Sequence, residues 1–294
     1  MFTVPGTKGK MKTGILVYDK ADAEYNEWFI NEIITKANGE DLKISLLLTE
    51  TLDAVEDDSE LLKNCDFAIM RNRNYKMSQY FESKGIKCFN SSPVCEIGND
   101  KWEMYQQFCK AGIPVMYTQQ KKLPFPFVMK PRDGHGGKNV FIIKNAQEYE
   151  AALNAICDDY AHTSDNSDKI KEFIAENYIY QFLASETGRD IRVYVLGDMI
   201  LTAMERTASG DEFRANFSLG GSAKEHALTE EELRLAARVA KLIRPDFIGI
   251  DIIYNAGKPV INEIEDAVGT RMLYRYTDID PVKEYVSWIA KQLI

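Results

Sequence analysis

Three carboxylate side chains lie close together in the sequence near the C-terminal end, in two short apolar runs on either side of a turn at residues 255–257. This pattern predicts a β-hairpin. Side chains alternate faces along a strand, so Glu263 and Glu265 point the same way, and pairing across the turn lets Asp251 join them. Crowded carboxylates repel unless a cation neutralises them, and oxygen-only ligands suit Mg²⁺ or Mn²⁺ together with substrate phosphates. The alternative is a solvated acidic hairpin, which the apolar flanks disfavour because unpaired charge there is costly.

A second segment, residues 127–140 (FVMKPRDGHGGKNV), combines a strand, a lysine and a glycine-rich loop before another strand. Glycines such as Gly136 and Gly137 let backbone N–H groups approach an anion, and Lys130 at the strand end can reach phosphate oxygens. No GK[ST] and no helix follow, so this is neither a Walker A loop nor a dinucleotide fingerprint. A plain hairpin turn is the alternative. His135 is expected to be a loop residue and not a base.

Charged residues also alternate along a strand pattern at residues 188–195, where Asp190 and Arg192 share one face. Arg206 and Arg214 are candidates for anchoring phosphates, because a guanidinium fork matches phosphate oxygens. The alternative for Arg192 and Arg206 is salt bridging among the strand charges. The pair Gly220-Gly221 is either a loop that lets a ligand approach the backbone or a simple turn.

The composition of the chain excludes several classes of protein. Its 294 residues suffice for two domains, and 45% apolar with 28% charged residues is ordinary for a globular protein. The net charge of −9 argues against a nucleic-acid surface, and no apolar run is long enough to cross a membrane. The N-terminus lacks the apolar core of a signal peptide. Five cysteines without a CxxC pair indicate reduced thiols and a cytoplasmic location.

Alternating strand and helix patterns predict a small parallel α/β domain up to about residue 98, with a turn-rich seam at residues 90–93. A single helix is expected at 23–37. The remainder, from residue 99 to 294, has an α+β pattern. It includes a polar stretch at 158–168 that is expected to be a mobile insertion.

The motifs, taken in order, resemble those of an ATP-grasp ligase close to the RimK-like group of amino-acid ligases. The matching strings are DKWEMYQQFCKAGIPVMYT, FVMKPRDGHGGKNV, QFLASETGRDIRVYVLGD, ERTASGDEFRANFSLGG and GIDIIYNAGKPVINEIEDAVG. The resemblance runs from about residue 100 to the C-terminus, and the preceding α/β unit fits the family's pre-ATP-grasp domain. It implies an α+β ATP-grasp domain whose two subdomains, about 99–176 and 177–294, clasp ATP.

The resemblance also implies roles for individual residues. Lys101 and Lys130 would contact the ATP phosphates, and Asp190 would lie near the ribose. Backbone groups of Gln181 and Phe182 would form the adenine hinge. Arg214 and Asn216 would contact phosphate or the reacting carboxylate. Asp251 and Glu263 would hold Mg²⁺, with Glu263 bridging two ions.

Three positions depart from the family pattern. Glu265 stands where relatives usually have Asn, which adds charge and makes Mn²⁺ an alternative to Mg²⁺. Leu219 replaces an Arg before Gly220-Gly221, in a region that faces the acceptor pocket in relatives. The turn after the metal strand reads DAVG and is followed by Arg271, which could bind a substrate carboxylate or be structural.

The resemblance therefore predicts an ATP-dependent carboxylate–amine ligase that works through an acyl phosphate and releases ADP and phosphate. Its substrates would be a small carboxylate and an amine, the latter an amino acid, a peptide or a protein terminus. A homo-oligomer is compatible with the sequence. The alternatives are an ATP-grasp kinase and a non-catalytic ATP-binding regulator, and ADP release that depends on an amine would separate the three.

Overall fold

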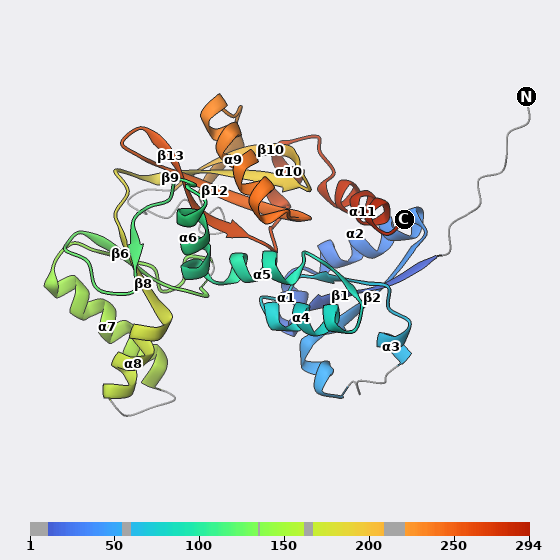
Figure 1. The fold of residues 1–294 in the computed structure, drawn as a ribbon, viewed down its shortest axis with the longest axis horizontal. Helices are drawn as coiled ribbons and strands as arrows, with labels where there is room; N and C mark the ends of the chain where they lie inside the picture. Colours follow the sequence, from blue (N-terminus) through green and yellow to red (C-terminus); the bar gives the residue numbers. More distant parts are fainter. Residues whose placement is uncertain (1–10, 55–59, 135, 162–166, 209–220) are drawn as a thin grey trace, which may run out of the picture.

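The computed structural model describes residues 11–54, 60–134, 136–161, 167–208 and 221–294. These residues form three β-sheets with helices packed around them (Figure 1). The expected combination of an α/β part followed by an α+β part is confirmed.

The first sheet is parallel and has the strand order β2-β1-β3-β4. Its central strands are mostly apolar, with β3 and residues 14–18 of β1 buried, as expected for a sheet covered on both faces. The predicted helix at 23–37 is instead two helices that meet at Asn26, whose side-chain Nδ2 donates to the Asp22 carbonyl oxygen at 2.8 Å. The elements are β1 (Lys12–Tyr18), α1 (Lys20–Tyr25), α2 (Glu27–Ala37), β2 (Leu42–Leu48), α3 (Glu60–Lys63), β3 (Phe67–Met70), α4 (Tyr75–Ser83) and β4 (Lys87–Phe89).

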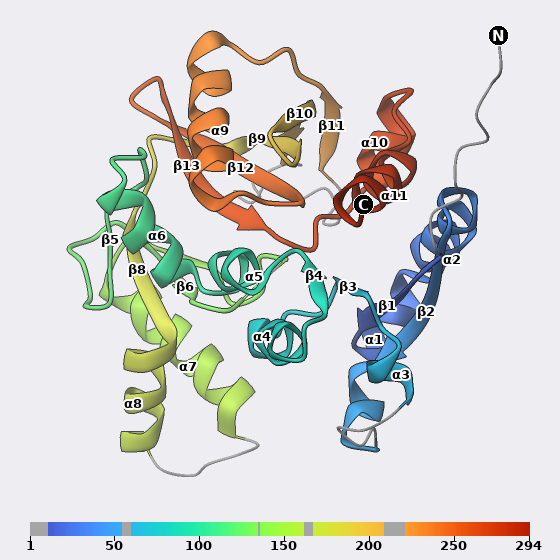
Figure 2. The same cartoon turned by 45° about the vertical axis from the view of Figure 1, so that its right-hand side comes forward.

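A small antiparallel sheet follows, in the order β5-β8-β6-β7, with two helices beneath it (Figure 2). Its strands are β5 (Thr118–Gln119), β6 (Phe127–Pro131), β7 (Phe141–Ile143) and β8 (Tyr178–Phe182). The expectation of an insertion at 158–168 is wrong at both of its ends. Helix α7 (Ala146–Ala161) continues into it and α8 (Ser167–Asn177) begins within it, because apolar residues of both helices pack on this sheet.

The third sheet is antiparallel, with the order β11-β10-β9-β12-β13. Two helices with side-chain N-caps pack on its core. Asp100 accepts hydrogen bonds from the first turn of α6, and Thr229 and Glu232 form a reciprocal capping box at α9. The elements are α6 (Lys101–Lys110), β9 (Glu186–Leu196), β10 (Met199–Thr207), β11 (Ser222–Glu225), α9 (Glu230–Ile243), β12 (Phe247–Asn255) and β13 (Lys258–Glu265).

The two ends of the chain share one hydrophobic core. Helices α10 (Arg271–Tyr276) and α11 (Pro281–Gln292) lie beside α2, and their apolar side chains join those of the first sheet (Figure 1). The predicted seam at 90–93 leads directly into helix α5 (Ser92–Asn99), which packs against α4, α6 and β13. The first sheet is therefore held firmly against the third, and the ends of its strands can form a wall of a shared cavity.

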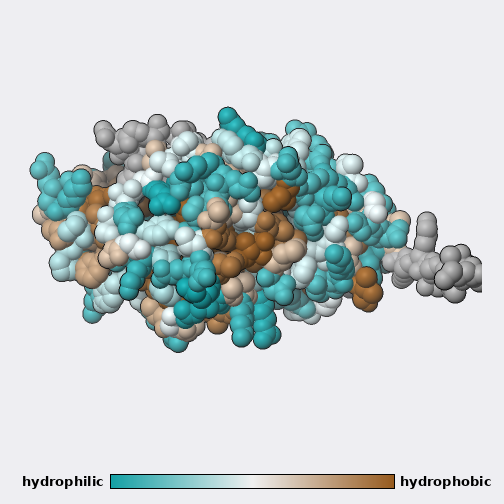
Figure 3. Space-filling model, turned by 90° about the horizontal axis from the view of Figure 1, so that it is seen from above, coloured by the Kyte–Doolittle hydropathy of each residue, from teal (hydrophilic) through white to brown (hydrophobic). Residues whose placement is uncertain are grey.

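Hydrophilic residues surround a brown, apolar cluster near the middle of the face shown in Figure 3. Within the described part of the chain, no helix combines the length and the apolar character needed to cross a membrane.

Candidate active site

A cavity of about 500 Å³ lies where the three sheets meet. Of the described residues that line it, eight are Lys or Arg and six are Asp or Glu. The cavity wall is therefore net positive in a chain whose net charge is −9. A positive cleft in an acidic protein favours an anionic ligand.

The predicted acidic hairpin forms part of this wall. Strands β12 and β13 pair antiparallel, and Asp251 lies directly opposite Glu263. One carboxylate oxygen from each of Asp251, Glu263 and Glu265 lies within 4.8 Å of the others. The expectation that the three carboxylates meet on one face is confirmed.

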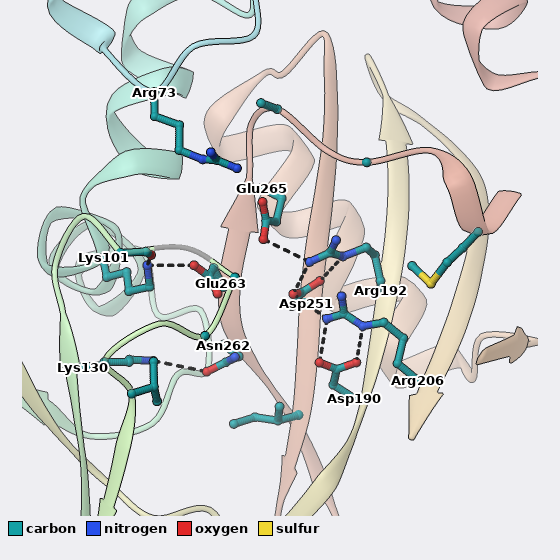
Figure 4. Close-up of a pocket in the computed structure, with 18 of the residues that line it drawn as sticks. Arg73, Lys101, Lys130, Asp190, Arg192, Arg206, Asp251, Asn262, Glu263 and Glu265 are labelled. Atoms are coloured by element: carbon teal, nitrogen blue, oxygen red, sulfur yellow. Dashed lines mark hydrogen bonds and ion pairs between the residues drawn. The ribbon is translucent and has the colours of Figure 1, made fainter. Parts of the chain in front are cut away.

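The crowded carboxylates were expected to repel unless a cation neutralises them, and the structure places cationic side chains of the protein beside them. Arg192 holds both oxygens of Asp251 at 2.7 Å, and Arg206 adds a third bond of 2.7 Å (Figure 4). Burial alone would raise the pKa of Asp251, but the two guanidinium groups outweigh it and lower the pKa to about 2. Asp251 is therefore an ionised carboxylate throughout the physiological range.

The other two carboxylates are also paired. Glu263 meets the ammonium of Lys101 at 2.8 Å, and Glu265 meets Arg192 at 3.2 Å. Burial would lower the pKa of Lys101, but Glu263 and Glu265 raise it above its usual value, so Lys101 is charged. Glu263 and Glu265 remain partly exposed to the cavity, with 21% and 19% of their side-chain surface accessible.

Lys130 has surroundings of a different kind. Its ammonium donates to three uncharged oxygens, at 2.8 Å to Tyr105 Oη, 3.1 Å to Gln181 Oε1 and 3.4 Å to Asn262 Oδ1. Burial lowers the pKa of Lys130 to about 7; Lys101 acts in the same direction and Glu263 opposes it. Among the described residues no carboxylate is bonded to this buried amine, which suits an incoming phosphate.

Arg206 and Asp190 are cross-strand partners in β10 and β9 and form a two-pronged ion pair, with both contacts at 2.7 Å. Both side chains are buried. The salt-bridging alternative raised for Arg192 and Arg206 is thus what the structure shows. Contacts of Asp190 with a ribose and of Arg206 with a phosphate remain predictions.

The glycine-rich loop connects β6 to β7, as expected. Gly136 and Gly137 line the cavity with φ angles of 66° and 76°, which a residue with a Cβ rarely adopts. Lys101 donates to the carbonyl oxygen of Gly134 and so ties α6 to the loop. His135 lies outside the described residues.

Residues 99–289 match the model of the RimK-like ATP-grasp domain. The chain belongs to this family. The match begins just before α6 and includes every residue of the acidic hairpin and the glycine-rich loop.

Two curated relatives and one solved structure show how far the RimK-like likeness extends. The "Uncharacterized protein MG011 homolog" of Mycoplasma pneumoniae is 29% identical over 275 residues, covering 90% of this chain and 88% of the relative. The "Probable alpha-L-glutamate ligase" of Haemophilus influenzae is 28% identical over 222 residues, which cover 72% of this chain and 69% of the relative. The crystal structure of D-cycloserine synthetase DcsG matches with a TM-score of 0.70 and 14% identity, over 96% of this chain and 100% of that one. This likeness shows a common ATP-grasp fold.

The adenine hinge expected of a RimK-like protein falls on β8. Gln181 is buried, and its side chain bridges Lys130 and the Thr118 hydroxyl. The backbone N–H of Phe182 donates to the Tyr117 carbonyl oxygen at 3.0 Å, and its ring is 41% exposed. Gln181 and Leu183 line the cavity, on either side of Phe182. Binding of adenine by backbone groups of Gln181 and Phe182 remains a prediction.

Several expected site residues of this RimK-like chain cannot be placed. Arg214, Asn216, Leu219 and Gly220 lie outside the described residues. Gly221 is the first described residue after that gap and precedes β11.

The oxygen donors of the cavity fit Mg²⁺, because hard cations take carboxylate ligands and Glu263 and Glu265 face open space. Any ion on Asp251 would share its oxygens with the two arginines. The buried lysines beside these carboxylates and the glycines of the loop fit the phosphates that Mg²⁺ accompanies.

Sequence reasoning missed Asn262 for a definite reason. The β12–β13 register shifts after Asp251, so that Asp251 faces Glu263 while Ile252 faces Ile261, and Asn262 is the extra residue of a bulge. Strict alternation would send Asn262 away from Glu263, yet both line the cavity. Tyr105 and Arg73 were also missed, because nothing in their local sequence marks them.

Proposed function

We infer that this protein is an ATP-dependent carboxylate–amine ligase that forms an amide bond through an acyl phosphate. The observation that supports this most directly is a single cavity in a RimK-like ATP-grasp chain that brings two kinds of group together. Clustered carboxylates lie beside two buried lysines, and a glycine-rich loop lines the same cavity.

In the first step a substrate carboxylate oxygen attacks the γ-phosphorus of ATP, and ADP leaves. In the second step an amine attacks the acyl carbon, phosphate leaves with the C–O bonding electrons, and the amine proton is released. Such transfers need positioning and charge neutralisation more than covalent help from the protein.

The chain's own residues would divide this work. Lys101 and Lys130 would bind phosphate oxygens, and the loop at Gly136 and Gly137 would cover them with backbone N–H groups. Arg192 and Arg206 hold Asp251 ionised and fixed in place. Asp251, Glu263 and Glu265 would hold Mg²⁺, with Mn²⁺ as an alternative. The ion would supply neutralisation of the phosphate charge.

Arg214 and Asn216 would complete the site near the reacting carboxylate, and Leu219, Gly220 and Gly221 would border the acceptor, as the family resemblance implies. Arg271, which this chain adds to the family pattern after the metal strand, would border the same acceptor. The acid and the amine are small molecules, and a peptide or protein terminus is a further acceptor class. All five cysteines are free thiols, and we place the protein in the cytoplasm.

An ADP-release assay over pairs of amino acids and peptides, with mass spectrometry of the products, tests this function. The name of the Haemophilus influenzae relative makes L-glutamate the first compound to include. We expect ADP release that needs both an acid and an amine, and an amide product. Release with one substrate and a phosphorylated product would indicate a kinase, and binding of ATP without release would indicate a regulator.

A further inference from the structure

The cavity extends beyond the ATP-grasp residues to the first sheet. In the order β2-β1-β3-β4, the chain direction of the connections reverses between β1 and β3. Open α/β sheets bind ligands outside the carboxyl ends of their strands at such a reversal. The segments that follow β1 and β3 both line the cavity, the first with Asp22 and the second with Arg73.

Arg73 and Asp22 face each other across this position. Arg73 Nη1 lies 3.3 Å from Asp22 Oδ2, and the two side chains are 28% and 38% exposed. Figure 4 shows Arg73 extending from its loop into the cavity, toward the end where Glu265 lies. The Arg73 guanidinium therefore combines a fixed position with access to the cavity.

Two neighbouring arginines, Arg71 and Arg271, instead make contacts within the protein. Arg71 is buried, donates to Tyr18 Oη at 3.2 Å and to the Val268 carbonyl oxygen at 3.0 Å, and stacks on Phe29. Arg271 lies 3.9 Å from the centre of the Tyr25 ring and donates to the Tyr25 carbonyl oxygen at 2.8 Å. Both contacts join the first sheet's domain to the C-terminal part of the chain.

We propose that Arg73 is a specificity-determining residue that binds a free carboxylate of the substrate. The ligand class is an amino acid, with its carboxylate on Arg73 and its reacting group toward Lys130 and the acidic hairpin. The proposal rests on the ligase function inferred above and names one substrate of that site. Asp22 is a positioning residue, because its ion pair fixes the fork that the carboxylate must meet.

The position of Glu265 gives the arginine a second effect. A carboxylate that enters this end of the cavity approaches Glu265, and like charges repel at short range. Arg73 offsets that repulsion on the side of the first sheet. A neutral carboxamide would gain little from Arg73, so this arginine should distinguish an acid from its amide.

Binding measurements test the proposal without any need for turnover. The protein is saturated with a non-hydrolysable ATP analogue and Mg²⁺ and screened by thermal shift against the standard L-amino acids and their α-carboxamides. Calorimetry then gives Kd for each amino acid that binds and for its amide. In the wild type we expect the acid to bind roughly ten- to hundredfold more tightly than the amide.

In Arg73→Gln this ratio should fall to about one, and Arg73→Lys should keep part of it, since a lysine retains the charge and loses the fork. Arg189→Gln removes the same charge from the same cavity, where Arg189 pairs with Glu205, and should keep the wild-type ratio. Thermal unfolding of each variant serves as the folding control.

Three outcomes would overturn the proposal: an unchanged ratio in Arg73→Gln, equal binding of acid and amide by the wild type, or no binding of any carboxylate compound. The ADP-release assay fails or succeeds independently of these. Suppose the wild type prefers the acid to its amide, Arg73→Gln loses this preference, and no ADP is released. That result would refute the ligase function and leave the carboxylate site standing.

Discussion

The guanidinium of Arg192 grips both carboxylate oxygens of Asp251, the central residue of the acidic hairpin, at 2.7 Å. Arg206 binds the same carboxylate from β10, and Lys101 pairs with Glu263. The protein itself therefore already offsets most of the negative charge at the proposed metal site. Its response to metal, to mutation and to nucleotide follows from these ion pairs.

Metal binding should depend on nucleotide. With Asp251 and Glu265 paired to Arg192, and Glu263 paired to Lys101, the carboxylates offer little net charge to a lone cation. We expect weak Mn²⁺ binding to the protein alone and at least tenfold tighter binding when an ATP analogue brings phosphate oxygens to the site. Electron paramagnetic resonance of free Mn²⁺ measures both affinities. Equal, tight binding in the two states would contradict a site whose negative charge the protein already largely offsets.

Replacing Asp251 should affect stability as well as turnover. Asp251→Ala removes a carboxylate that the buried side chains of Arg192 and Arg206 both bind. We expect the free energy of unfolding to fall by about 3–5 kcal/mol. Glu263 is partly exposed and faces a single lysine, so Glu263→Gln should remain folded and lose ATP turnover. Urea unfolding and the ADP-release assay give the two readouts. A stable, fully active Glu263→Gln protein would remove Glu263 from the metal site.

ATP binding should be accompanied by proton uptake. Burial lowers the pKa of Lys130 to about 7, so at pH 8 most of the free protein carries this amine neutral. Phosphate oxygens favour the charged form and raise the pKa, so the amine takes up a proton on binding. Calorimetry at pH 8 in buffers of different ionisation enthalpy should show an uptake approaching one proton for the wild type.

The matched control for that measurement is Lys130→Met, which keeps the aliphatic stem and removes the titrating group. It should bind ATP more weakly and show no uptake. The apparent affinity of the wild type should also fall as the pH rises above 7, because an increasing fraction of the free protein must be protonated. Proton uptake that persists in Lys130→Met would assign the titration to another group.

The glycine-rich loop between β6 and β7 should respond to nucleotide. Gly136 and Gly137 give its backbone unusual freedom, and they line the same cavity as the acidic hairpin. We expect hydrogen exchange at residues 132–139 to slow by at least tenfold when an ATP analogue is bound, because the loop closes over the phosphates. Residues of α9 serve as the internal reference. Strong, equal protection with and without the analogue would exclude a closing flap.

Local patterns were sufficient to predict much of this molecule. The turn at residues 255–257, flanked by apolar alternation, predicted the β12–β13 hairpin and the meeting of Asp251, Glu263 and Glu265. The glycine-rich stretch between two short strands predicted the β6–β7 loop. These features depend on contacts between residues close in sequence, where alternation and turn chemistry dominate.

Tertiary structure alone decided which cations face those carboxylates. Arg192 and Arg206 reach Asp251 only because β9 lies between β10 and β12 in the third sheet, an order that no local pattern encodes. The bulge that turns Asn262 toward Lys130 is a matter of strand register, set by packing on both sides of the hairpin. Arg73 enters the cavity because α10 and α11 hold the first sheet against the third. Charge pairing acts through space between distant segments, so the sequence determined the reactive groups and the fold determined their partners.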